Sequence, residues 1–178
     1  RGFQQRIDKA VFGDELIALV GSQKLTRLAL DGRLHEFLAS NDYGGKKLSD
    51  LAGGWLAKAR PLQGQKVVEF HKVWAYFART FGFELVGTVE ERPGIQPGPR
   101  HLRELIVLMK QKGVRLVLVD NIYDPSLAER IAKDAGARAV VLPNQVRGDK
   151  GVDDYFALID RVLDSTLVTR GQSGSGPR

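Results

Sequence analysis

The sequence predicts an α/β fold, in which a small, mostly parallel four-stranded sheet is flanked by helices and preceded by a helical region. The main observation is that short apolar runs alternate with amphipathic stretches of helical period after Gly64. Such alternation predicts right-handed crossovers and a parallel sheet. A second observation is that the run 114–119 (VRLVLV) is almost entirely apolar, as expected for a strand covered on both faces.

The expected strands and helices alternate along the second part of the chain. The strands comprise 66–70 (KVVEF), 84–89 (ELVGTV), 114–119 and 139–142. The apolar periodicity predicts helices over 73–81, 100–112, 125–135 and 152–163. Asp124 can cap the third helix with Pro125 in its first position, and Gly113 and Gly136 suit the ends of two helices.

The first part of the chain is helical and irregular in pattern. Apolar residues recur at helical spacing within 3–20, the segment 41–47 (NDYGGKK) predicts a loop, and 51–60 predicts a further helix that Pro61 ends. We therefore expect a helical linker region at 1–63, an α/β lobe at 64–168 and a flexible tail at 169–178.

Composition excludes several kinds of site. The 178 residues include no cysteine, so disulfides, thiolate metal sites and cysteine nucleophiles are excluded. The net charge of +6 is spread along the chain rather than clustered around aromatic residues, so we expect no nucleic-acid partner. No apolar run approaches a membrane span, and no signal peptide is evident at the start. Because Arg1 already lies in a helical pattern, we expect a fragment or a processed product.

Ligands of open parallel sheets bind beyond the carboxyl ends of the strands, so the residues that follow each strand are candidates for a site. They are His71, Glu90 with Glu91, Asp120 with Asn121, and Pro143 with Asn144. A neutral imidazole at residue 71 could bind a borderline metal such as zinc. A single histidine at a strand end can equally be a capping or core residue.

Structural roles are expected for most other polar and aromatic candidates. We expect His35 at the surface, His101 as a solvated or loop-bracing residue and Trp74 in the core. Asp120 is expected to cap the turn that follows it. Glu90 and Glu91 are adjacent on a strand and should point to opposite faces.

No motif of an enzyme active site is apparent. No G-x-S-x-G, Walker loop or G-x-G-x-x-G follows an expected strand, and no nucleophile is paired with a base. The sequence therefore predicts a protein that is not an enzyme.

Three segments resemble a known family. They are LQGQKVVEFHKVWAYFARTFGFELVGTVE, RPGIQPGPRHLRELI and KGVRLVLVDNIYDPSLAERIAKDAGARAVVLP. Four features follow one another in an order that is specific to this family. They are a strand followed by His, an aromatic helix, a G-T-V-E strand and a P-G-I-x-P-x-P-R-H loop. Over 62–163 the chain thus resembles the C-terminal lobe of the ZnuA/TroA-like zinc and manganese substrate-binding proteins of ABC importers, a group that includes adhesion-type lipoproteins.

The resemblance implies a function in metal transport. In that family two lobes clasp one divalent metal in the cleft between them and deliver it to an ABC permease. The N-terminal lobe of the family brings two histidines, and we expect that lobe to be absent from this chain. His71 matches the first ligand position of the C-terminal lobe, where histidine is associated with zinc and glutamate with manganese. The implied location is the periplasm or the outer face of the bacterial cytoplasmic membrane, and residues 1–20 would belong to the helix that joins the lobes.

The chain departs from the family pattern in two places. The acid expected after the fourth strand is replaced by VLPNQV, in which Asn144 is the nearest candidate and a weak neutral ligand. The segment 23–54 has no clear counterpart. Two alternatives stay open: a lobe of this type without a metal site that acts as an interaction module, and a doubly wound α/β enzyme domain.

Overall fold

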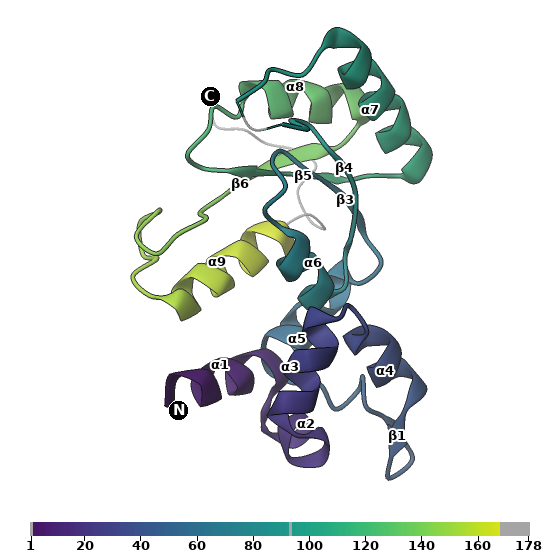
Figure 1. The fold of residues 1–178 in the computed structure, drawn as a ribbon, viewed down its shortest axis with the longest axis vertical. Helices are drawn as coiled ribbons and strands as arrows, with labels where there is room; N and C mark the ends of the chain where they lie inside the picture. Colours follow the sequence, from purple (N-terminus) through teal and green to yellow (C-terminus); the bar gives the residue numbers. More distant parts are fainter. Residues whose placement is uncertain (1, 93, 168–178) are drawn as a thin grey trace, which may run out of the picture.

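The expected four-stranded sheet is present, and all its strands are parallel. A computed structural model describes residues 2–92 and 94–167, so the expected tail at 169–178 lies outside the described residues. The strand order is β4-β3-β5-β6 (Figure 1). The strands are β3 (Lys66–Glu69), β4 (Glu84–Thr88), β5 (Leu116–Asp120) and β6 (Arg138–Leu142). The predicted fold class is confirmed.

Helices cover both faces of the sheet. Helices α7 (Pro99–Lys112) and α8 (Ser126–Ala135) pack together on one face. Helices α6 (Ala75–Phe81) and α9 (Tyr155–Leu167) lie on the other face (Figure 1). Helix α9 begins at Tyr155, whereas the apolar pattern predicted a start at Val152, three residues earlier.

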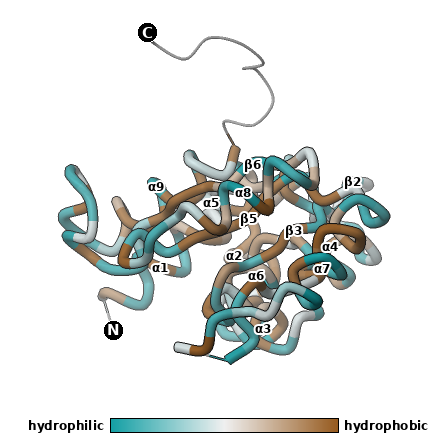
Figure 2. Tube along the Cα trace, turned by 90° about the horizontal axis from the view of Figure 1, so that it is seen from above, coloured by the Kyte–Doolittle hydropathy of each residue, from teal (hydrophilic) through white to brown (hydrophobic). Residues whose placement is uncertain are grey.

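The central strand β5 contributes to two separate apolar cores. Leu116 and Leu118 belong to the cluster that contains Val162 of α9, whereas Val117 and Val119 belong to the cluster beneath α7 and α8. Successive side chains of a strand point to opposite faces, so an all-apolar strand can fill both cores. In Figure 2 this strand is brown and lies between the helices.

The first part of the chain forms a small helical subdomain next to α6. Its elements are α1 (Gly2–Phe12), α2 (Asp14–Val20), α3 (Ser22–Leu30), α4 (Leu34–Ser40), β1 (Asp42–Tyr43), β2 (Lys46–Lys47), α5 (Gly54–Lys58) and the 3₁₀ turn η1 (Arg60–Leu62). The apolar cluster of this subdomain is continuous with the core on the α9 face of the sheet. The division at residue 64 stays a prediction.

Three expectations for this subdomain are wrong. Of the segment expected to belong to one helix (1–20), the described residues 2–20 form two helices, because Gly13 has a positive φ of 79° and separates α1 from α2. The expected loop 41–47 contains the hairpin β1–β2, whose two-residue Gly44-Gly45 turn has positive φ at both positions and so suits paired strands. The expected helix 51–60 is reduced to α5.

His35 is half-buried, which corrects its predicted place at the surface. Its Nε2 donates a hydrogen bond of 3.0 Å to the carbonyl oxygen of Thr80, near the end of α6. Burial lowers the pKa of His35 below its usual value of 6.5, although this hydrogen bond opposes the shift. The residue therefore joins α4 to α6 in its neutral form.

We expect His35 to make stability depend on pH. As the pH falls below 6.5, the unfolded chain binds the proton before the folded chain does, so the free energy of unfolding falls towards the lower folded pKa. Above 6.5 the contribution is fully present. The free energy of unfolding can be measured with urea at about pH 7.5 and at about pH 5.5. Its fall between these two pH values should be smaller in His35→Gln than in the parent. Equal losses would contradict this assignment.

Candidate functional site

The carboxyl ends of three neighbouring strands bring one imidazole and two carboxyl groups together. His71 lies two residues beyond the end of β3, Glu90 two residues beyond the end of β4, and Asp120 is the last residue of β5. The backbone N–H of Glu90 donates to the carbonyl oxygen of Phe70 at 2.9 Å, so the ladder between β3 and β4 continues to the site. The positions of these side chains are therefore set by the sheet.

His71 lies between the two acids. Its Nε2 is 2.5 Å from Oε2 of Glu90, and its Nδ1 is 3.9 Å from Oδ2 of Asp120. The ring of Tyr123 covers the imidazole, with a centroid distance of 3.9 Å, and the ring of Phe70 lies on another side at 4.8 Å. His71 is buried, but it faces carboxyl groups at the strand ends as well as hydrocarbon.

Several buried polar atoms at this site have no hydrogen-bond partner among the described residues. They are Nδ1 of His71, both carboxylate oxygens of Asp120, Nε1 of Trp74 and Oδ1 of Asn121. Asp120 is only 1% exposed, so the predicted role of its side chain as a turn cap is wrong. Leaving buried polar groups unpaired is costly, so such a group points to a missing water, ion or ligand.

Burial also shapes the electrostatics of the acids. It raises the pKa of Asp120, although the nearby His71 opposes the shift. Burial likewise raises the pKa of Glu69, the last residue of β3, whose Oε2 accepts a hydrogen bond from the backbone N–H of Trp74. A bound cation would favour the ionised forms of such carboxyl groups.

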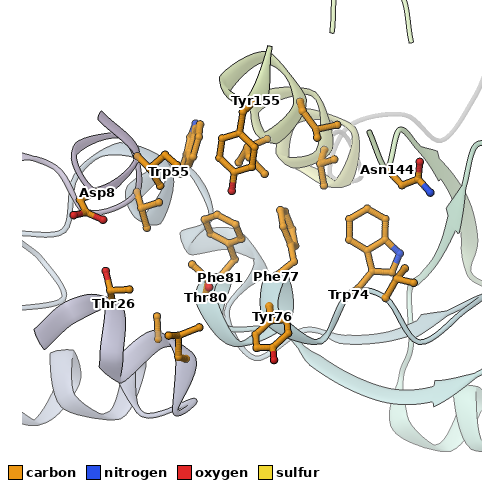
Figure 3. A pocket seen from close by; sticks show the side chains of 18 of the residues that line it. Asp8, Thr26, Trp55, Trp74, Tyr76, Phe77, Thr80, Phe81, Asn144 and Tyr155 are labelled. Carbon is orange, nitrogen blue, oxygen red and sulfur yellow. The ribbon is translucent and has the colours of Figure 1, made fainter. Parts of the chain in front are cut away.

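Asn144 shares no hydrogen bond with His71, whose described side-chain partner is Glu90. Asn144 is exposed and lines a cavity of about 410 Å³ together with Asp120 and Trp74. Figure 3 shows Asn144 beside Trp74 at one end of this cavity. Within residues 2–92 and 94–167, no three His, Asp or Glu side chains are grouped so that they could hold a metal ion. These described residues therefore contain no complete set of metal ligands.

The remaining expectations are mostly met. His101 braces the loop after β4, where its Nε2 donates to the carbonyl oxygens of Thr88 and Val89 at 3.1 Å each. Trp74 is buried in the core. Glu90 and Glu91 do point apart, since Glu90 meets His71 and Glu91 lies 3.9 Å from His101. Sequence reasoning missed the pairing of Glu90 with His71, which the adjacency of β3 and β4 would have indicated.

Beside this site the cavity has a largely apolar wall. Figure 3 shows Phe77 and Phe81 of α6 opposite Tyr155 of α9, with Trp74 and Asn144 at one end. Four of its lining residues are large, apolar and exposed: Leu30, Val73, Tyr76 and Tyr155.

No helix within the described residues is both long and apolar enough to cross a bilayer.

The parallel four-stranded sheet with helices on both faces matches the fold of TroA-like solute-binding proteins. The chain belongs to the family of the zinc-uptake complex component A, periplasmic (ZnuA), whose model matches residues 37–167.

Similar proteins support the same family. The high-affinity zinc uptake system protein ZnuA of Bacillus subtilis is 26% identical over 131 residues, which cover 68% of this chain and 41% of that protein. The zinc-binding protein AdcA of Streptococcus pyogenes is 23% identical over 72% of this chain and 26% of its own length. The chain therefore spans less than half the length of these relatives.

Solved structures agree on the fold. A crystal structure of ZnuA superposes with a TM-score of 0.53 at 25% identity, over 81% of this chain and 51% of that one. The solute-binding protein FpvC of Pseudomonas aeruginosa, solved in complex with Mn²⁺, superposes with a TM-score of 0.52 at 21% identity, over 92% and 55%.

Proposed function

We propose that this chain is the C-terminal metal-binding lobe of the solute-binding component of an ABC importer, with zinc as its principal cargo. His71 is the observation that carries the proposal, because it places a ligand-type nitrogen at the carboxyl end of the first strand of a parallel sheet. The whole protein would hold the metal in a cleft between two lobes and release it to the permease. No catalytic step is involved.

The choice of zinc rests on the donor atom and on the relatives. Imidazole nitrogen suits zinc, whereas manganese prefers harder oxygen ligands. The relatives from Bacillus subtilis and Streptococcus pyogenes are a zinc uptake protein and a zinc-binding protein by name. Manganese is the alternative cargo.

The proposed location is the periplasm or the outer face of the cytoplasmic membrane, in keeping with the periplasmic family.

The exposed apolar rim of the cavity supports a second lobe in the complete protein. Val73, Tyr76 and Tyr155 expose large apolar side chains beside the strand ends, which are costly to leave in water. The ZnuA structure is about twice as long as the part that this chain covers. We propose that an N-terminal lobe packs against this rim, that it brings the remaining ligands, and that residues 1–63 connect it to the lobe formed by residues 64–168.

The contact between His71 and Glu90 favours one alternative function. Because the carboxylate already satisfies Nε2, the imidazole could be a purely structural residue in a lobe that acts as an interaction module. Metal analysis of the longer protein after purification without added metal separates the two functions. About one zinc per protein is expected for a solute-binding component, and an absence of any bound metal favours the interaction module.

We expect the 178-residue chain alone to bind zinc weakly. Protein sites for zinc usually need about four ligands, and the strand ends of this chain supply at most half of them. Titration calorimetry with Zn²⁺ should therefore give a dissociation constant above about 1 μM, far from the affinity of complete sites. A submicromolar constant would show that this chain contains a complete site and would refute the shared-cleft arrangement.

A further inference from the structure

We infer that Glu90 is a second metal ligand of this lobe, acting beside Nε2 of His71; the inference rests on the proposed function. The two residues come from neighbouring strands and meet at the same edge of the sheet. Neither the expected acid after the fourth strand nor Asn144 is needed for the lobe to supply an oxygen ligand. The acid comes from the second strand of the lobe instead.

The distance between the donor atoms fits this role. Oε2 of Glu90 is 2.5 Å from Nε2 of His71, so a proton now links the two atoms. Two ligands of a tetrahedral zinc ion, each about 2.0–2.1 Å from the metal, lie about 3.3 Å apart. If a metal ion replaces the shared proton, Nε2 and Oε2 must therefore move apart by slightly less than about 1 Å. A side-chain rotation of Glu90 can provide this increase in distance.

Asp120 is suited to a different role. It lies on the Nδ1 side of the ring, 3.9 Å away, and both its oxygens are buried without a hydrogen-bond partner among the described residues. A histidine that binds metal through one nitrogen usually donates its other N–H to a carboxylate or carbonyl oxygen. When Nε2 gives up its proton, Nδ1–H can donate to Asp120, so this pair of unpartnered groups supports metal binding through Nε2.

The environment distinguishes Glu90 from the acid next to it. The side chain of Glu90 is 12% exposed and its backbone N–H is anchored to Phe70, whereas the side chain of Glu91 is 68% exposed. A buried, positioned carboxylate loses little conformational freedom when it binds a cation. A water-exposed carboxylate that points towards His101 gains little from a cation bound at His71. Glu91 is therefore the matched control for Glu90.

The test uses the 178-residue chain, Zn²⁺ alone and the three histidines of the sequence, which can be resolved by ¹⁵N-imidazole NMR. Zinc should shift the Nε2 resonance of His71 and leave a protonated Nδ1. The zinc concentration at half-saturation should rise at least about tenfold in Glu90→Gln and stay within about twofold in Glu91→Gln. Glu90→Gln keeps the size and hydrogen-bonding capacity of the side chain and removes only its charge and metal affinity.

Each outcome bears on one of the two proposals. If the Nε2 resonance of His71 responds to zinc equally in Glu90→Gln and Glu91→Gln, Glu90 is not a ligand, while the proposed function stands. If Glu90→Gln binds zinc more tightly, the carboxylate competes with the metal for Nε2, which also overturns the inference. If zinc shifts no nitrogen resonance of His71 in the parent chain, Glu90 and His71 do not hold a metal ion together and the inference is overturned, whereas metal analysis of the longer protein decides the proposed function.

Discussion

Replacing His71 by alanine in a protein that carries this chain and the proposed second lobe should weaken zinc binding by well over about tenfold. Among the described residues, His71 is the imidazole that lies between Glu90 and Asp120, whereas His101 contacts the carbonyl oxygens of Thr88 and Val89. Removing the His71 imidazole also leaves the half-buried Glu90 and the buried Asp120 without the ring that lies between them. Zinc affinity is measured by competition with a chelator of known affinity.

His35→Gln is the control for His71→Ala. It changes a half-buried histidine that contacts Thr80 rather than the strand ends, so zinc affinity should stay within about twofold of the parent. An unchanged affinity in His71→Ala would remove this residue from the site. A loss of affinity in both variants would indicate a general effect on folding, which circular dichroism of each variant would detect.

Replacing Gly54 by alanine should destabilise the fold by about 2–5 kcal/mol. The residue has a positive φ of 53°, which a side chain adopts only at a cost. A Cβ at this position would also clash with the carbonyl oxygen of Ala10, so the backbones of α1 and α5 would have to separate. Chemical denaturation monitored by circular dichroism measures the loss.

Gly44→Ala isolates the conformational part of that cost. Gly44 has a similar φ of 57°, but nothing lies within 4 Å of the position its Cβ would take. This variant should lose only about 1–2 kcal/mol. If the two variants were equally destabilised, close packing of α1 on α5 would not be the reason that Gly54 is needed.

The site was partly predictable from the sequence. His71 was identified because it directly follows a short apolar strand, and strand ends carry the ligands of parallel sheets. The role of Glu90 could not be derived in the same way, because it depends on β4 lying next to β3. Asn144 was selected for its place in the chain after the fourth strand. That strand is at the edge of the sheet, one strand removed from β3, and no hydrogen bond joins Asn144 to His71.

The helical subdomain was the least predictable part of the fold. Its apolar periodicity predicted helices, but their ends depend on close backbone contacts such as that between Gly13 and Gly53. The pattern showed no partner for these glycines, so the expected helix 51–60 ran through Gly53 and Gly54 instead of beginning where α1 and α5 meet. His35 was likewise placed at the surface, because nothing local indicates that Thr80 accepts its hydrogen bond.

The sequence by itself determined the alternation of strands and helices, the parallel sheet and the residue that carries the proposed metal site. Those features follow from local periodicity, because a buried strand must be apolar and an amphipathic helix must repeat every three or four residues. Tertiary structure alone decided which acids surround His71, because strand order and side-chain burial arise from contacts between residues far apart in the chain. Glu90 and Asp120 flank the imidazole only because β4 and β5 lie on either side of β3.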